Sequence, residues 1–199
     1  MIFLHTQLFG HSTIVLSNRD YGRKSMMPLL KKIRAKAKRK ARPSYGIVDS
    51  QSVKTTSASD ERGFDGGKKV KGRKRHITTD IMGNLLSVKV HAANIHDTVA
   101  GVDVFKDALS KYPSIKGCAA DTGYRGTFAR ALEELGISVD IIDRIAPKTW
   151  SVLPKRWIVE RTFAWANNSR RLSKDYEITT KSAENMFMIS HLATLLRRF

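Results

Sequence analysis

The sequence predicts an α/β domain in which a mixed β-sheet is flanked by helices. Two short apolar segments, residues 45–48 and 115–120, are each followed directly by an aspartate. A β-hairpin pattern lies between them, and segments with helical periodicity separate the later strand-like segments. A chain of 199 residues, 41% of them hydrophobic, is long enough for one domain of about 150 residues and an appendage.

The charge balance indicates a polyanionic partner. The chain carries 36 Lys and Arg against 18 Asp and Glu, a formal net charge of +18. Residues 1–44 contain 11 basic residues and 1 acidic residue, and eight of the basic residues lie within residues 31–42. We interpret residues 1–44 as a basic, flexible arm that binds phosphate without reading sequence, and residues 45–199 as the folded domain. The lone Cys118 excludes an internal disulfide and fits a reducing cytoplasm.

The first half of the domain is expected to contain a strand and a hairpin. The segment YGIVDS at 45–50 is typical of a short buried strand, and the polar residues 51–72 predict a flexible loop. Residues 75–80 and 85–90 alternate like strands around a Gly83-Asn84 turn. The segment KKVKGRKR at 68–75 forms a second phosphate-facing patch if the loop lies near the site.

The second half alternates helices and strands. A helix at 96–112, with Val99 on its buried side and Asp97 as its N-cap, can cross over to a parallel strand at 115–120. A helix at 127–135 and a strand at 137–142 follow, and helices at 154–172 and 182–198 complete the order. The last helix carries an apolar stripe that indicates core or a dimer seam, with core as the default: Met186, Phe187, Ile189, Ala193 and Leu196.

The two aspartates after the apolar strands point to metal chemistry. If these strands are neighbours, their backbones lie about 4.8 Å apart, so Asp49 and Asp121 can approach one cation together. Hard oxygen ligands at the ends of adjacent strands favour Mg²⁺ or Mn²⁺. The bland alternative is that each aspartate forms a turn or caps a helix, which is common after a strand.

A third carboxylate lies on the helix at 154–172. Helical geometry puts Arg156, Glu160, Asn167 and Arg171 on one face, opposite an apolar stripe that faces the core. On this interpretation Glu160 binds metal while Arg156 and Arg171 contact phosphate; a simple ion pair within the helix remains the alternative for Glu160. Trp157 and Trp165 border this face, where packing on the last helix is favoured over stacking on a flipped base.

Several segments resemble the DDE transposases of bacterial insertion sequences, in particular the insertion sequence five-like group of the insertion sequence four/five superfamily. The resemblance covers residues 43–199. It rests on IVDSQSVKT at 47–55, KKVKGRKRHITTDIMGNLL at 68–86, ANIHD at 93–97, AADTGYRG at 119–126 and RWIVERTFAWANNSRRLSKDYE at 156–177. The last three segments, in this order, are highly specific.

The resemblance implies a ribonuclease-H-like fold in which Asp49, Asp121 and Glu160 coordinate two Mg²⁺ or Mn²⁺ ions. It implies Mg-dependent cleavage and strand transfer at insertion-sequence ends, with double-stranded terminal repeats and target DNA as partners and a homodimer in the synaptic complex. The basic residues expected at the DNA, from this resemblance and from the basic patches, are Lys54, Lys71, Arg73, Lys74, Arg75, Arg125, Arg156, Arg161, Arg170 and Arg171.

Two departures from the family pattern bear on this expectation. Leu153 and Asn167 stand where the family tends to have Tyr and a basic residue, which affects DNA positioning more than metal binding. Residues 1–30 do not look like the longer N-terminal DNA-binding region of such enzymes, so we expect an N-terminally truncated chain. An inactive remnant that only binds DNA is therefore the main alternative.

Other classes explain less of the sequence. A ribosomal-type RNA-binding protein would account for the charge but not for the three acids. Tyr45, Tyr124 and Tyr176 could serve as recombinase nucleophiles, but no Arg and His constellation surrounds any of them in the sequence. No run of about 18 apolar residues predicts a membrane span. We expect a cytoplasmic protein that is associated with the nucleoid when it is bound to DNA.

Overall fold

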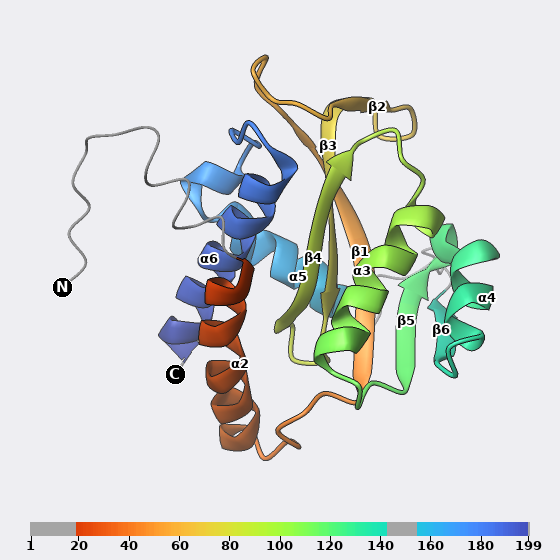
Figure 1. Cartoon of the computed structure of the whole chain (residues 1–199), viewed down its shortest axis with the longest axis vertical. Coiled ribbons are helices and arrows are strands. Elements are labelled where there is room, and N and C mark those ends of the chain that lie inside the picture. The colour runs from red at the N-terminus through yellow and green to blue at the C-terminus, as the bar shows by residue number, and fades with distance from the viewer. Residues whose placement is uncertain (1–18, 143–154, 199) are drawn as a thin grey trace, which may run out of the picture.

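The computed structural model describes residues 19–142 and 155–198 (Figure 1). Its strands form one mixed six-stranded sheet in the order β2-β3-β1-β5-β6, with β4 paired to the same edge of β3 as β2. The strands are β1 (Tyr45–Lys54), β2 (Gly63–Asp65), β3 (Val70–Thr79), β4 (Leu85–Ala92), β5 (Gly117–Asp121) and β6 (Ser138–Ile142). The expected class, an α/β fold with a mixed sheet flanked by helices, is confirmed.

The pairing of β1 with its two neighbours sets up the site. β1 runs antiparallel to β3 and parallel to β5, with Tyr45 opposite Gly117 and Ile47 opposite Ala119. Asp49 and Asp121 each lie two residues beyond the Ile47–Ala119 pair. The condition on which the metal argument depended, that these two strands are neighbours, is met, and their aspartates lie at matching positions. The hairpin of β3 and β4 also forms as predicted, with Gly83 at φ +79° in its turn.

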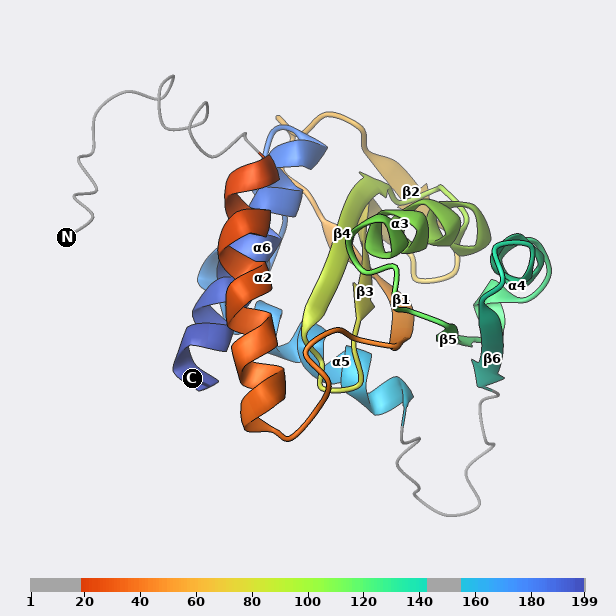
Figure 2. The ribbon, with the colours of Figure 1, turned by 60° about the horizontal axis from the view of Figure 1, so that its bottom comes forward.

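Helices cover both faces of the sheet. Helices α3 (Asp97–Lys111) and α4 (Thr127–Glu133) lie on one face, and α5 (Arg156–Asn167) lies on the other. Helix α6 (Thr180–Arg198) packs against β4 and α5, and α2 (Arg19–Lys36) packs against α6 on the outside (Figures 1 and 2). Two short 3-10 turns, η1 (Thr122–Tyr124) and η2 (Arg170–Leu172), follow β5 and α5.

Strand alternation divides the core between the two faces. On β1, Val48 packs with Phe105 and Phe128 on the α3 side, whereas Ile47 packs with Val159 on the α5 side. Because side chains alternate along a strand, Asp49 has the same orientation as Ile47. The same argument gives Asp121 the orientation of Ala119, which belongs to the α5-side cluster. Both aspartates therefore share the face of the sheet that α5 covers.

Helix α2 differs from the flexible arm expected for residues 1–44. Met26, Leu30 and Ile33, spaced four and three residues apart, are buried on one face of this helix. Arg34, from the basic run, is only 4% exposed and pairs with the fully buried Asp80 at the end of β3. Thus part of the basic run is a packed helix, and Lys38, Arg39, Lys40 and Arg42 are exposed after its end. Residues 1–18 of the expected arm lie outside the described residues.

Local boundaries also differ from the sequence-based expectations. The polar residues 51–72, expected to form a loop, include strand residues: β1 continues to Lys54, β2 spans 63–65 and β3 begins at Val70, because backbone pairing across the sheet does not depend on side-chain polarity. The N-cap of α3 is His96 rather than Asp97, since the His96 side chain accepts the Thr98 N–H. Val99 is 57% exposed, so its expected burial was wrong.

The C-terminal helix seals the free edge of β4. The buried side chains of His191 and Glu184 accept the backbone N–H groups of Leu85 and Val90, which an edge strand would otherwise present to solvent. In the expected apolar stripe Phe187 is core, whereas Leu196 is 60% exposed. No helix of the described part of the chain is both long enough and apolar enough to cross a membrane.

Candidate active site

Asp49 and Asp121 form a carboxylate pair beneath the N-terminal half of α5. Both line a hollow of about 210 Å³ together with Arg156 and Val159 of that helix. Burial raises the pKa of Asp49 to about 7; the Ser50 N–H donated to it opposes this, and the nearby Asp121 carboxylate adds to the rise. A buried acid beside a second acid is costly to ionise, and a cation between them would offset that cost.

Glu160 reaches the same region from α5. It lines a second, open hollow of about 660 Å³ with Asp49, Lys68 and Asn167. Its side chain is 53% exposed and pairs with Arg156 at 3.0 Å, one helical turn away. Asp49 thus borders both hollows, and Arg156 lies between the aspartate pair and the glutamate. The ion pair that was the alternative interpretation for Glu160 is present.

The carboxylates of Asp49, Asp121 and Glu160 are the candidate ligands for a divalent cation. Among the described residues no three His, Cys, Asp or Glu side chains lie close enough together to hold a metal ion. Asp121 accepts the Gly123 N–H at 2.9 Å, and Glu160 faces Arg156, so each acid has a partner from the chain itself. The close pair Asp49 and Asp121 nevertheless has the oxygen chemistry and the electrostatic need that suit Mg²⁺ or Mn²⁺. The three acids therefore fit a divalent cation. Glu160 would have to break its ion pair with Arg156 in order to bind it.

Lys68 belongs to the expected phosphate-facing patch at 68–75 but was not among the individual residues expected at the DNA. Its ammonium group donates to the Ser50 carbonyl at 3.3 Å, and its charge opposes the rise in the pKa of Asp49. Lys68 therefore lies beside the carboxylates of Asp49 and Glu160. Asp65 holds the loop in place, because its carboxylate accepts the N–H groups of Gly67 and Lys68 and the Ser52 hydroxyl. The sequence Asp65-Gly66-Gly67-Lys68 indicates this turn, because an aspartate carboxylate often accepts the backbone N–H groups two and three residues later.

Three basic residues expected at the DNA are instead structural, and this expectation is corrected. Arg73 and Arg75 have no exposed surface, and Lys74 is 7% exposed. Arg73 binds the carbonyls of Asp60 and Glu177 and the Asp175 carboxylate, while Arg75 donates to the Leu172 carbonyl. Because both guanidinium groups donate to acceptors inside the protein, they hold the segment after α5 against β3.

The remaining expected DNA contacts are spread over the surface. Lys54, Lys71, Arg125 and Arg170 are exposed, and Arg171 is exposed but bonded to Glu177. Arg161 is held between two tryptophans: its guanidinium lies 4.4 Å from the Trp157 ring centre and 4.6 Å from that of Trp165.

Trp165 also lies against Arg198 of α6, whereas Trp157 is 45% exposed. The expected packing against the last helix is therefore confirmed for Trp165. Leu153, the other departure from the family pattern, lies outside the described residues.

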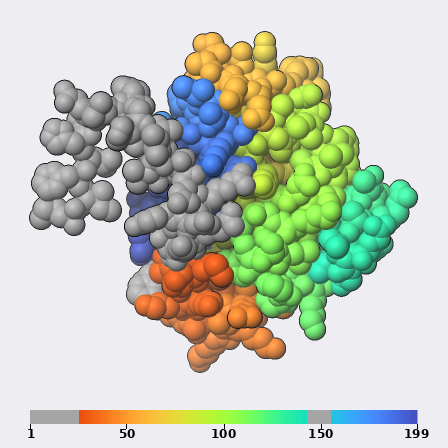
Figure 3. Space-filling model, viewed as in Figure 1, coloured from red at the N-terminus to blue at the C-terminus, as the bar shows by residue number. Residues whose placement is uncertain are grey.

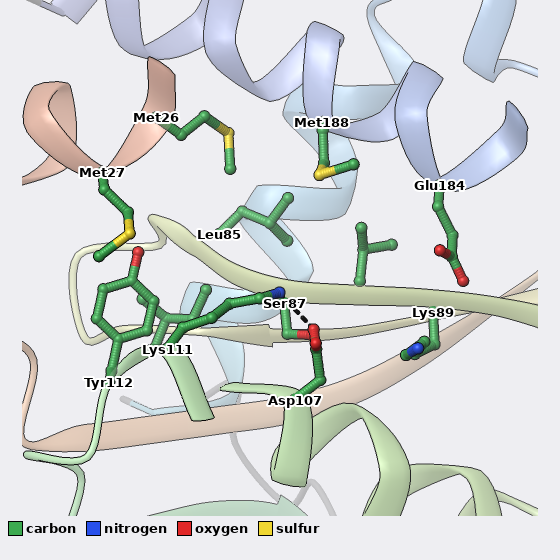
Figure 4. A pocket seen from close by; sticks show the side chains of 12 residues that line it. Met26, Met27, Leu85, Ser87, Lys89, Asp107, Lys111, Tyr112, Glu184 and Met188 are labelled. Carbon is green, nitrogen blue, oxygen red and sulfur yellow. Dashed lines mark hydrogen bonds and ion pairs between the residues drawn. The ribbon is translucent and has the colours of Figure 1, made fainter. Parts of the chain in front are cut away.

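A further hollow lies far from the carboxylates. Its volume is about 490 Å³, and it lies between α2, α3, α6 and β4 (Figure 4). Met26, Met27 and Met188 line one side, and Asp107 bonds Ser87 and Lys111 on the other. In the space-filling view, α3 lies between the region of α2 and the projecting α4 and β6 (Figure 3). Apolar and charged side chains of three helices and β4 line this hollow, and none of the three candidate acids is among them.

Comparisons with known proteins identify the family of this chain. The transposase DDE domain family matches residues 40–196. A putative transposase for insertion sequence element IS402 from Burkholderia cepacia is 32% identical over 115 residues, which are 53% of this chain and 54% of that protein. The chain thus matches about half the length of this relative.

Two solved structures are similar to this chain at low sequence identity. The catalytic core domain of BIV integrase has 11% identity and a TM-score of 0.47, covering 74% of this chain and 82% of that one. The catalytic domain of Mos1 mariner transposase has 10% identity and a TM-score of 0.43, covering 91% of each chain. The match of the family over most of the sequence decides the assignment: this chain belongs to the transposase DDE domain family.

Proposed function

We propose that this chain cuts DNA at the ends of an insertion sequence and joins the freed ends to target DNA. The observation that carries the proposal is the pairing of Asp49 and Asp121 at matching positions of adjacent parallel strands, with Glu160 on the helix that covers them. An arrangement of three acids around a solvent-open hollow, with lysine and arginine beside it, suits a phosphodiester substrate. From the motifs, we also propose that the element belongs to the insertion sequence five-like group.

The three acids are the proposed ligands of Mg²⁺ or Mn²⁺, with two ions expected. When bound, such ions supply activation of a water or 3′-hydroxyl nucleophile and stabilisation of the leaving oxygen. Asp49, a half-buried side chain that lines both hollows, contributes one carboxylate. Asp121, anchored to the Gly123 N–H, contributes the second. Glu160, which is more exposed, contributes the third from the rim of the hollow.

The cationic side chains at the hollow are proposed to hold the DNA backbone. Lys68 and Arg156 lie next to the acids, so a phosphate bound near Asp49 would lie within reach of both charges. The exposed basic residues after α2, together with Lys54, Lys71, Arg125 and Arg170, are proposed to bind flanking duplex DNA through its phosphates. The proposed partners are the terminal inverted repeats and the target, and the proposed synaptic assembly contains two copies of the chain.

The test is a cleavage assay with linear DNA carrying the element's terminal repeats. The parent chain is incubated with Mg²⁺ or Mn²⁺ beside Asp49→Asn, Asp121→Asn and Glu160→Gln, which keep side-chain size while removing charge. Asp103→Asn, an exposed carboxylate on α3, is the matched control. We expect nicking by the parent and by the control but not by the three site variants.

Two results would contradict this expectation in different ways. A parent chain that binds the repeat DNA but never nicks it with either cation would support the alternative, an inactive remnant that only binds DNA. Nicking that persists in all three site variants would place the chemistry elsewhere in the protein.

A further inference from the structure

A chain of buried aromatic and imidazole side chains lies directly behind the carboxylate pair, on the opposite face of β1. The Tyr124 hydroxyl lies 2.6 Å from His76 Nε2, and His76 Nδ1 lies 3.3 Å from His91 Nε2. His91 Nδ1 in turn lies 3.0 Å from the Ala92 carbonyl oxygen. Tyr124 and His76 are fully or almost fully buried, so water does not replace these bonds.

The carbonyl at the end of this chain sets the direction of every bond in it. A carbonyl oxygen only accepts, so His91 Nδ1 carries the hydrogen and His91 Nε2 is a bare acceptor. His76 Nδ1 must then donate to His91, which leaves His76 Nε2 as an acceptor. The Tyr124 hydroxyl must therefore donate to His76. Burial lowers the pKa of His76 to about 3, in agreement with a neutral ring that has one hydrogen.

Tyr124 links both aspartates to this network. It is the last residue of η1, whose N-cap is Asp121, so it ends the turn that holds the Asp121 carboxylate on the Gly123 N–H. His76 lies opposite Ser50, the residue after Asp49, in the pairing of β1 with β3, and the Ser50 hydroxyl donates to Asp97. The Tyr124 ring packs against Phe128, with ring centres 5.1 Å apart.

We propose that Tyr124 is a positioning residue that fixes Asp121 relative to Asp49 through the directed chain Tyr124 to His76 to His91. This inference rests on the proposed function for its consequence, because the distance between these two carboxylates decides how well they share a cation. Tyr124 itself touches neither cation nor DNA in this role. Groups that orient metal ligands from behind typically change metal affinity by about 10- to 100-fold when they are removed.

The test compares Tyr124→Phe with Tyr112→Phe. Both substitutions remove a buried phenol oxygen and keep the ring, but Tyr112 lies at the end of α3 and lines the hollow remote from the acids. Mn²⁺ affinity is measured by calorimetric titration of the full chain, and exchange of the Gly123 amide proton is measured by NMR without metal. We expect Tyr124→Phe to weaken Mn²⁺ binding about tenfold and to speed Gly123 exchange at least severalfold. Tyr112→Phe should leave both at the parent's values.

The outcomes separate this inference from the proposed function. A parent that binds Mn²⁺ but does not cleave DNA refutes the proposed function and leaves the positioning role to be judged by the two affinities. If the parent chain does not bind Mn²⁺, the exchange rate of the Gly123 amide proton alone decides whether Tyr124 has the positioning role. Unchanged exchange and affinity in Tyr124→Phe overturn the inference, as does ¹⁵N NMR showing His76 in the parent with its hydrogen on Nε2.

Discussion

The ion pair between Arg34 and Asp80 offers a direct test of how α2 is joined to the domain. Arg34 is 4% exposed and Asp80 is fully buried, and Asp80 also accepts the N–H groups of Met82 and Asn84. Arg34→Met keeps the apolar stem and removes the charge. Breaking a buried pair typically costs 3–5 kcal/mol, and the surviving hydrogen bonds to Asp80 reduce this, so we expect a loss of about 2–4 kcal/mol in unfolding free energy.

The measurement is urea denaturation of four chains: the parent, Arg34→Met, Asp80→Asn and the double variant. Asn at position 80 can still accept the backbone N–H groups of the turn through one oxygen, while its amide group replaces the oxygen that accepts from Arg34 and the Asn84 side chain. Because the two residues are in contact, the double variant should cost less than the sum of the single variants by about 1–3 kcal/mol. Arg39→Met, on the exposed residues after α2, serves as the control and should change stability by less than about 0.5 kcal/mol.

Two results would refute the reasoning about this pair. A cost below about 1 kcal/mol for Arg34→Met would mean that residue 34 behaves as a solvated surface charge. Strict additivity in the double variant would mean that the two side chains do not interact. Either result would restore the flexible-arm interpretation for this part of the basic run.

Three further predictions follow from single contacts. Gly101→Ala in α3 should lower stability, although the same change stabilises an ordinary helix by about 1 kcal/mol, because the new Cβ would lie 2.8 Å from the Tyr124 ring; a higher melting temperature would contradict this. Burial lowers the pKa of His191 from 6.5 to about 3, so between these pH values only the unfolded chain binds a proton at this ring. The contribution of the neutral His191 to the unfolding free energy is therefore fully present above pH 6.5 and falls by about 1.4 kcal/mol per pH unit below it. In denaturation curves from pH 7 to 5, His191→Gln should show a smaller acid-side loss than the parent, and parallel curves would contradict the assignment. Arg156→Gln should cost less than about 1 kcal/mol in stability, since its partner Glu160 is half exposed, yet should weaken binding of repeat DNA in a mobility-shift titration; unchanged binding would remove Arg156 from the proposed interface.

Local pattern was sufficient for much of the fold. The apolar strands before Asp49 and Asp121, the Gly83 turn and the amphipathic face of α5 depend on nearby residues, so their types were predictable. The parallel direction of β5 relative to β1 was predictable from the crossover helix that precedes β5. The apolar positions of α2 were also visible, but the high charge around them favoured an arm, and only packing on α6 makes that helix part of the structured region.

The sequence by itself determined where the strands and the candidate acids lie along the chain, because residue type and alternation are local properties. The tertiary structure decided which charges are available to a ligand. Arg73 and Arg75 belong to the most basic segment of the domain, yet both donate to acceptors about 100 positions later in the chain, whereas Lys68, five residues before Arg73, remains at the acids. Burial and hydrogen-bond saturation depend on contacts between distant segments, and no window of sequence contains both partners of such a contact.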